Sequence, residues 1–145
     1  MFKQYQSKDL SWKDFREKVV GATDPSKALP SSLRARLYRE WKELGMREQP
    51  TLQNNCVHAS AGPFEAIQER ITWIDMELSK DPFARVLTGA GVPVDWISRC
   101  CANEVITVNG KTGPAFDLFE DADSSTVVDL AIELLKQRDN PDVNF

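Results

Sequence analysis

Apolar residues recur at helical spacing in short stretches of this chain, and glycine or proline closes each stretch. Trp12, Phe15 and Val19 share one face of a helix expected over residues 11–20, which Ser11 caps and Gly21 ends. Stretches with the spacing of strands are few and weak. The pattern predicts a mainly α fold, with α+β as the alternative, of six or seven short helices and one or two short strands.

Further helices follow from the same spacing. The second is expected to begin at Ser31 or Ser32, with an apolar stripe formed by Leu33, Leu37, Trp41 and Leu44, where it ends before Gly45. The third is opened by Ser60, Gly62 and Pro63, with the proline in its first turn, and ends near Ser79. It turns one apolar face to a core; that face carries Phe64, Ile67, Ile71, Ile74 and Leu78. Shorter helices are expected at residues 81–91 and 93–101, and a last one at residues 125–137.

Two segments suit strands. Residues 46–58 are polar except for a brief apolar stretch at Cys56 and Val57, which suits a short strand or an extended segment. Residues 104–108 are followed by Asn109-Gly110, a dipeptide typical of a two-residue hairpin turn. A parallel βαβ sheet is not expected.

The composition is that of an ordinary globular protein, with 41% hydrophobic and 28% charged residues among 145. No run approaches the roughly 18–20 apolar residues that a membrane-spanning helix needs. The first fifteen residues mix lysines with Asp9 and Asp14, which is typical neither of a secretory signal nor of a transit peptide. We expect one domain, or one domain with an appendage.

Charge is divided unevenly along the chain. Residues 1–70 hold 12 Lys and Arg against 9 Asp and Glu, a net charge of +3, whereas residues 71–145 hold 6 against 13, a net charge of −7. The basic first half favours phosphates or an acidic partner, and the acidic second half argues against a broad nucleic-acid surface. No nucleic-acid partner is therefore expected.

Three cysteines, Cys56, Cys100 and Cys101, are an odd number, and two of them are adjacent. Neighbouring cysteines rarely bridge each other, and no Cys-x-x-Cys or His–Cys spacing indicates zinc. We interpret all three as reduced thiols that serve as small buried hydrophobic residues. This predicts an intracellular, reducing compartment, either the cytoplasm or an organelle such as the mitochondrion.

The only histidine, His58, has neighbours suited to phosphoryl transfer. Ser60 follows two residues later, and Glu69 lies on the next expected helix, within reach of the imidazole. A carboxylate that holds one ring nitrogen leaves the other free to attack. Phosphoryl transfer also needs cations and donors around the phosphate, which Arg34 and Thr23 are suited to supply. The alternative for a single histidine is a purely structural role.

Two motifs in order resemble a known family. Residues 21–34, GATDPSKALPSSLR, are similar to the Gly-x-Thr-Asn/Asp-Pro, Pro and Ile/Leu-Arg stretch of nucleoside diphosphate kinases. Residues 55–60, NCVHAS, resemble the Asn-x-x-His-x-Ser active-site strand of that family, and the helix that follows matches it at Ala66, Glu69 and Trp73. The resemblance extends over about residues 12–74 and concerns the half of the kinase that carries the active-site histidine.

The resemblance implies a role for each matching residue. His58 would be the nucleophile that becomes phosphohistidine, and Glu69 would orient its ring. Asn55 would touch the nucleotide sugar or the transferred phosphate, while Thr23 and Arg34 would bind phosphate oxygens. No resident metal or other cofactor is implied, because magnesium would arrive with the nucleotide.

The chain also departs from the family. The family's first strands, a lysine of its catalytic site and its nucleotide-stacking aromatics precede this stretch, whereas here only a short segment does. Glu17 stands where the family has an arginine, and the stretch from Arg34 to Asn55 is longer. We therefore expect a truncated remnant of a ferredoxin-like kinase fold at residues 1–79 and a helical C-terminal extension packed on it at residues 80–145.

Two functions of different classes follow. The favoured one is a degenerate relative of the kinase that acts as a non-catalytic structural or interaction subunit, with protein partners in a larger complex. Its interface candidates, for which ordinary core is the alternative, are Trp12, Trp41, Trp73 and Trp96. The other function is an active nucleoside diphosphate kinase-type phosphotransferase that binds nucleotide and works through a phosphohistidine at His58. A phosphohistidine relay without turnover is a third interpretation, and catalysis itself stays an open question.

Overall fold

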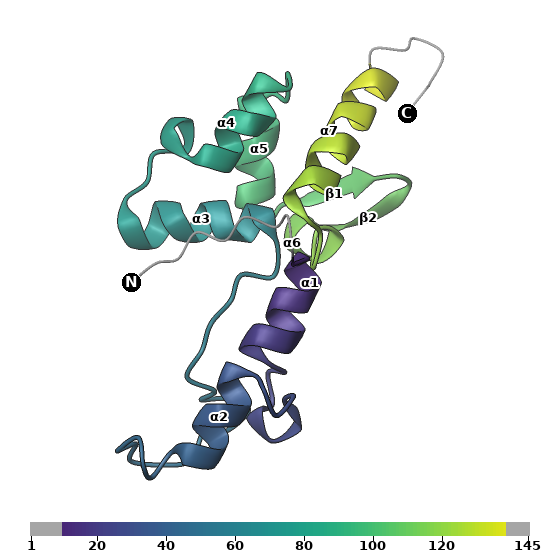
Figure 1. The fold of residues 1–145 in the computed structure, drawn as a ribbon. Coiled ribbons are helices and arrows are strands. Elements are labelled where there is room, and N and C mark those ends of the chain that lie inside the picture. The colour runs from purple at the N-terminus through teal and green to yellow at the C-terminus, as the bar shows by residue number, and fades with distance from the viewer. Residues whose placement is uncertain (1–9, 139–145) are drawn as a thin grey trace. The chain divides into compact units, whose positions relative to one another are not determined.

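The computed structural model describes residues 10–138, which belong to two compact units, Met1–Ala59 and Ser60–Phe145. The mainly α fold is confirmed, because the described residues form seven α-helices and one two-stranded antiparallel sheet (Figure 1). The division expected from the sequence was after residue 79, whereas the boundary between the two units is after Ala59, before the helix at Pro63–Ile74. That helix packs with the elements that follow it.

The first unit opens on the expected helix. α1 (Trp12–Asp14) continues without a break into the π-helical turns of η1 (Phe15–Val20). Ser11 caps it as predicted, since its hydroxyl accepts a 3.0 Å hydrogen bond from the backbone N–H of Asp14. Gly21 ends it at a φ of 99°, where a β-carbon would overlap the hydroxyl of Ser32.

The next helix, α2 (Leu33–Glu40), follows the short 3₁₀ turn η2 (Pro25–Lys27) and is capped by Ser32. A Schellman turn closes it. The N–H of Met46 bonds to the carbonyl of Trp41 at 2.9 Å, the N–H of Gly45 bonds to the carbonyl of Lys42 at 3.1 Å, and Gly45 has a φ of 69°. Helical turns thus extend close to the predicted end at Leu44.

The apolar stripe expected on α2 is largely exposed. Leu33 and Leu44 are 48% and 47% exposed, and the helix buries Arg34 and Ala35. Of the two structures expected for residues 46–58, a short strand or an extended segment, the strand does not form. Cys56 has a φ of 65°, and the side-chain oxygen of Asn55 accepts a hydrogen bond from the N–H of Val57, so the chain makes a local turn there.

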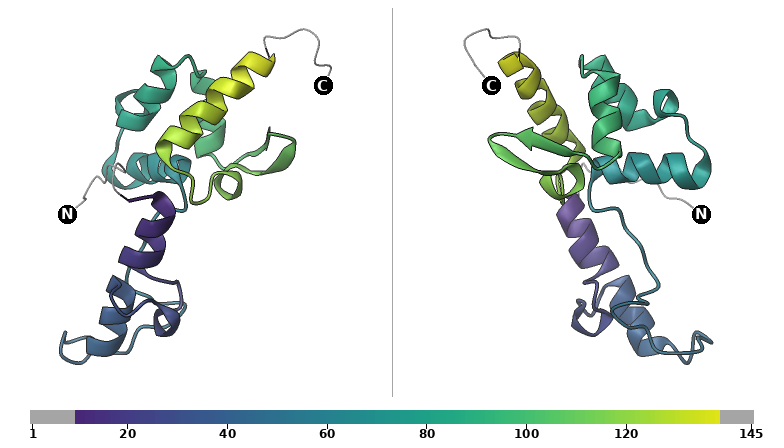
Figure 2. Two further views of the ribbon diagram at one scale, coloured as in Figure 1. Left: turned by 45° about the vertical axis from the view of Figure 1, so that its right-hand side comes forward. Right: turned by 180° about the vertical axis from the view of Figure 1, so that it is seen from behind.

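The second unit contains the remaining elements. In chain order these are α3 (Pro63–Ile74), η3 (Leu78–Lys80), α4 (Pro82–Gly89), α5 (Val94–Cys101), β1 (Val105–Val108), β2 (Lys111–Pro114), α6 (Ala115–Leu118) and α7 (Ser124–Arg138). α3, α4 and α5 pack on one another, and the hairpin lies against α6 (Figure 2). α3 ends before the predicted Ser79, because Asp75 adopts a left-handed conformation that stops the helix at Ile74.

The predicted hairpin is confirmed. Val108 pairs with Lys111 across the turn, and Asn109 and Gly110 both have positive φ, 50° and 73°. Such a turn matches the twist of the two strands, which is why Asn-Gly is so common there. Ile106 and Val108 face the core, whereas Val105 is 62% exposed.

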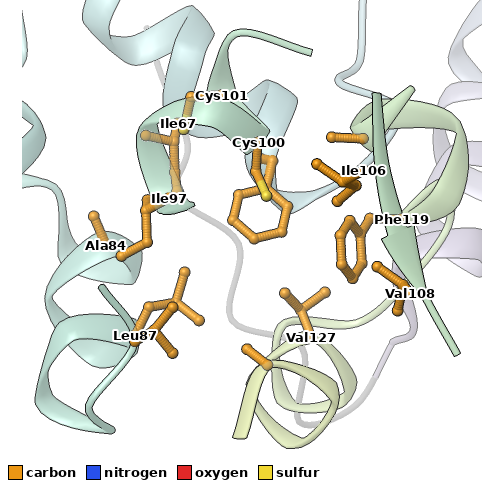
Figure 3. Packing of buried hydrophobic residues seen from close by; sticks show 14 residues of the cluster. Ile67, Ala84, Leu87, Ile97, Cys100, Cys101, Ile106, Val108, Phe119 and Val127 are labelled. Carbon is orange, nitrogen blue, oxygen red and sulfur yellow. The ribbon is translucent and has the colours of Figure 1, made fainter. Parts of the chain in front are cut away.

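The hydrophobic core belongs to the second unit. Phe64 lies at its centre, with its ring centroid 4.9 Å from that of Phe119 and 5.6 Å from that of Trp96. Figure 3 shows Ile106 and Val108 of the hairpin beside Phe119. In the described part of the first unit, by contrast, the buried aliphatic side chains other than proline are only Val20 and Ala35. Hydrophobic burial therefore stabilises mainly the second unit.

Gly62 is expected to tolerate no side chain, although its backbone is extended. A β-carbon there would overlap the carbonyl oxygen of Phe119, which is held by the backbone and cannot move aside cheaply. Gly62→Ala should lower the unfolding free energy of the second unit by about 1–3 kcal/mol. Gly89→Ala in α4 is the matched control, since nothing lies within 4 Å of its β-carbon position; it should stabilise by about 0.5–1 kcal/mol. Equal effects in chemical denaturation would contradict this packing.

The cysteines fall into two classes. Cys100 and Cys101 on α5 are buried in the core, as predicted, but Cys56 is exposed, contrary to the prediction. Burial raises the pKa of each buried thiol to about 12, with further raising by the neighbouring Cys101 for Cys100 and by Asp81 for Cys101. Neither buried thiol is a nucleophile at neutral pH.

A thiol reagent at pH 8 should therefore modify one cysteine of the folded protein and three after denaturation. The stability of the folded protein should also fall at alkaline pH. The unfolded chain ionises its thiols at about pH 8.5, whereas the folded chain keeps both buried ones protonated up to about pH 12. Their contribution to stability is complete below the first value and declines as pH rises toward the second. Rapid modification of all three native cysteines would show that α5 is not buried as described.

Candidate functional site

Arg34 is the centre of the segment that resembles the kinase. It lies in the first turn of α2 and is only 9% exposed. Its Nη1 donates a hydrogen bond to the carbonyl of Gly21, and its Nη2 donates one to the carbonyl of Val57, both at 2.6 Å. One guanidinium thus links the loop that begins at Gly21 to the segment that contains Val57 and His58 through two hydrogen bonds.

The electrostatics of Arg34 fit this bridging role. Burial, and next the positive charge of Arg16, lowers the pKa of Arg34 from its ordinary value, although a guanidinium stays charged in proteins. Its Nε is buried and has no hydrogen-bond partner within residues 10–138. Each terminal nitrogen donates one of its two N–H groups to a main-chain oxygen, and the side chain as a whole is buried, so little of the guanidinium is accessible to a phosphate.

Thr23 lies on the loop that Arg34 holds, two residues after Gly21, and its side chain is exposed. The loop is shaped by Asp24, whose carboxylate accepts hydrogen bonds from the N–H and the hydroxyl of Ser26 at 3.1 and 2.6 Å. The Ser26 hydroxyl holds the pKa of Asp24 below its ordinary value. Asp24 therefore caps the short 3₁₀ turn at residues 25–27, and Thr23 directly precedes this cap.

Asn55 and His58 lie on the extended segment that leads out of the first unit. The side-chain oxygen of Asn55 serves the local turn described above, 3.3 Å from the N–H of Val57. His58 is exposed and directly follows Val57, whose carbonyl Arg34 holds. Thr23, Arg34, Asn55 and His58 therefore all belong to the first unit, in which Arg34 links the backbone at Gly21 to the backbone at Val57.

Glu69 belongs to the other unit. It lies on α3, where its carboxylate accepts a 2.6 Å hydrogen bond from the hydroxyl of Ser60. Glu65, one turn earlier, accepts a hydrogen bond from the N–H of Ala61. Both carboxylates therefore fix the entry into α3. The predicted partners His58 and Glu69 thus fall on opposite sides of the division between the units.

The first unit also has an open hollow of about 320 Å³. Its lining contains none of the predicted site residues and consists of Asp24, Ser26, Tyr38, Gln49, Pro50, Thr51 and Leu52. Gln49 donates a hydrogen bond to the carbonyl of Tyr38 at 3.0 Å, which ties the wall of the hollow to α2. The hollow is therefore distinct from the histidine segment.

Two buried polar residues escaped the sequence reasoning. Ser32 is fully buried, and its hydroxyl caps α2 beside Gly21. Asp81 is also fully buried, and its carboxylate lies 2.6 Å from Nε of Arg70. The Asp-Pro pair at residues 81–82 indicated a helix start, but nothing in the spacing pointed to Arg70 as the partner.

Within the described range, no group of three or more His, Cys, Asp or Glu side chains could hold a metal ion. Residues 10–138 also contain no helix with the length and apolar character needed to cross a membrane. Comparison of the chain with protein-family models, curated proteins and solved structures found no match.

Proposed function

We propose that this chain is a degenerate relative of nucleoside diphosphate kinase that acts as a non-catalytic subunit of a larger protein assembly. The observation that carries the proposal is the placement of Arg34. The residue that the resemblance assigns to phosphate is buried and donates both terminal nitrogens to backbone carbonyls. A charged donor to a buried carbonyl contributes to stability and is costly to remove.

The other matching residues support the same interpretation. Asn55 closes a turn, and Glu69 holds the hydroxyl of Ser60 at the start of α3. Phosphoryl transfer depends on preorganised groups around the phosphate, and small displacements are costly in rate. We infer that a site in which Arg34 and Asn55 hold the main chain and Glu69 holds Ser60 is arranged for structure rather than for a phosphate.

The need for a partner is supported by the first unit. Its described part has almost no buried aliphatic side chains, while five large hydrophobic ones are exposed: Val19, Leu29, Leu33, Leu44 and Leu52. Such surfaces mark sites of protein interaction. Of the tryptophan candidates, Trp73 is 57% exposed, whereas Trp96 packs on Phe64 in the core.

The alternative is an active phosphotransferase. The observation in its favour is that His58 is exposed on the segment beside Arg34, and that every residue type assigned by the resemblance is present. Under this alternative, another subunit or the nucleotide itself would reorganise Arg34.

Phosphotransfer separates the two. The full chain is incubated with labelled ATP and magnesium, alone and in its native assembly, and is examined for acid-labile, alkali-stable phosphate, with His58→Ala as the control. The proposal predicts no label that depends on His58 and no transfer to GDP. Label that vanishes in His58→Ala and passes to GDP would overturn it.

A further inference from the structure

We propose that Asn109 is a site of spontaneous chemical modification, at which the chain loses ammonia and acquires an aspartate or an isoaspartate linkage. The residue lies at the tip of the hairpin in the second unit, so the proposal is independent of the function proposed for the histidine segment. In the sequence it is the only asparagine that a glycine follows. The structure adds that both groups that must react are accessible.

The reaction joins a main-chain atom to the neighbouring side chain. The backbone nitrogen of Gly110 attacks Cγ of Asn109 and a C–N bond forms. The side-chain amide leaves as ammonia and takes up the proton of the attacking nitrogen, so that a five-membered succinimide ring closes. Water then opens the ring at one of its two carbonyls. Opening at Cγ gives aspartate, and opening at the main-chain carbonyl gives isoaspartate, in which the main chain runs through the side-chain carbons.

Neither reacting group is engaged in a hydrogen bond within residues 10–138. The pairing of Val108 with Lys111 closes the hairpin, so the N–H of Gly110 lies outside the ladder. The side-chain amide of Asn109 is exposed and has no partner in the same range. Apart from adjacent residues, nothing lies within 4 Å of the β-carbon position of Gly110, and the hairpin projects from the second unit (Figure 2). The tip can therefore distort to bring the nitrogen to Cγ without disturbing the core.

Asn103 shows the opposite environment for a similar residue. It is also exposed, and its φ is 55° against 50° for Asn109. It belongs to a Schellman turn that closes α5, in which the N–H of the next residue, Glu104, donates to the carbonyl of Arg99 at 3.1 Å. The side-chain oxygen of Asn103 accepts a 2.8 Å hydrogen bond from the N–H of Phe116. Ring closure at Asn103 requires both groups to leave these bonds, which corresponds to a rate lower by about tenfold or more.

The two products differ in their effect on the hairpin. Asp-Gly is as typical of this turn as Asn-Gly, so the aspartate form keeps the pairing and adds one negative charge. Isoaspartate inserts an additional carbon into the main chain between Val108 and Lys111, which a two-residue turn does not accommodate. Ile106 and Val108, both 6% exposed, depend on this register for their burial. The isoaspartate form should therefore have a loosened hairpin.

The experiment follows ammonia loss in the full chain by peptide mapping with mass spectrometry at mildly alkaline pH, because the attacking nitrogen must lose its proton. An isoaspartyl methyltransferase with a labelled methyl donor measures isoaspartate. The decisive variant is Glu104→Gly, which places glycine after Asn103 and leaves the main-chain N–H of residue 104 in the Schellman turn. The Arg99–Glu104 ion pair that it removes is about half exposed and contributes little. A parallel incubation in urea removes the fold from the comparison.

In the folded Glu104→Gly chain, we expect Asn109 to react at least about tenfold faster than Asn103, whereas in urea both should react at similar rates. Asn109→Gly, which suits the same turn, should show no ammonia loss from the hairpin peptide. Equal rates at the two sites in the folded chain, or a difference that persists in urea, would overturn the proposal. So would an Asn109 that stays intact in the folded protein and reacts only in urea. Circular dichroism verifies that the variants are folded.

Hydrogen exchange tests the structural consequence. The fraction enriched in isoaspartate should exchange the amides of residues 105–113 at least about tenfold faster than the unmodified protein. Asn109→Asp, which represents the other product, should exchange as the unmodified protein does. Equal exchange in the isoaspartate fraction would contradict the dependence of the hairpin on its two-residue turn.

Discussion

Replacing Asp81 by alanine is expected to lower the unfolding free energy of the second unit by about 3–5 kcal/mol, enough to unfold much of it at ambient temperature. Asp81 is fully buried between α3 and α4. One carboxylate oxygen accepts hydrogen bonds from the N–H groups of Phe83 and Ala84, at 2.9 and 3.0 Å, and so caps α4. The other lies 2.6 Å from Nε of Arg70. The variant loses the cap and leaves a partly buried guanidinium without its counter-charge.

Glu77→Ala is the control for this prediction. Glu77 also forms an ion pair, at 2.7 Å with Lys80, but both side chains are more than half exposed. Such a pair contributes about 0–1 kcal/mol. Urea unfolding followed by tryptophan fluorescence and circular dichroism gives both values. Similar losses in the two variants would show that Asp81 does not join α3 to α4 as described.

Replacing Arg34 by methionine is expected to destabilise the first unit, so that it unfolds locally, while the second unit stays folded. Methionine fills most of the space but leaves the carbonyls of Gly21 and Val57 without their charged donors. Each such hydrogen bond is worth about 1.5–3 kcal/mol, and removal of a desolvated charge offsets part of the loss. Because this unit buries so few aliphatic side chains, hydrophobic burial does not compensate for the two lost hydrogen bonds. Hydrogen exchange should accelerate at residues 21–58 and stay unchanged in the core of the second unit.

Arg36→Met on the same helix is the matched control. Arg36 pairs with Glu40 on the surface, with the Arg36 side chain 64% exposed, so its removal should leave hydrogen exchange in the first unit nearly unchanged. Unchanged exchange in Arg34→Met would mean that the guanidinium does not hold the first unit. Equal acceleration in both variants would mean that any charge lost from α2 has the same effect.

Local signals predicted the secondary structure well. Ser11 and Ser32 cap helices, Gly21 and Gly45 end them, and Asn109 with Gly110 turns the hairpin. In each case one or two residues decide the conformation through hydrogen bonds or positive φ, so a short stretch of sequence contains the whole cause. Six of the seven α-helices were expected in their order, whereas α6 was not predicted.

Burial was harder to predict, because it depends on what a helix meets. The stripe of α2 has the spacing of a buried face, yet Arg34 is buried in its place. The two carbonyls that select Arg34 come from Gly21 and Val57, which are 13 and 23 residues away in the chain. Periodicity along one helix contains no information about such distant oxygens. Cys56 was misjudged for a similar reason, since a positive φ placed it outside any strand.

The candidate site was predictable as a set of residue types but not as an arrangement. Thr23, Arg34, Asn55 and His58 all belong to the first unit, and Arg34 binds the main chain at Gly21 and Val57. The assigned roles depend on where each polar atom points, and Arg34 and Asn55 use theirs on the main chain. His58 belongs to the first unit and Glu69 to the second, and no local pattern marks the boundary at residue 59.

Titration of the nitrogen-15-labelled chain with magnesium ADP, followed by amide and arginine side-chain NMR signals, tests the central claim most directly. If Arg34 serves the backbone, its Nη resonances and the amides of residues 21–25 and 55–60 should show no saturable shift at millimolar nucleotide. Saturable shifts confined to Thr23, Arg34, Asn55 and His58, with loss of the bonds from Arg34 to Gly21 and Val57, would contradict the account and restore a nucleotide site.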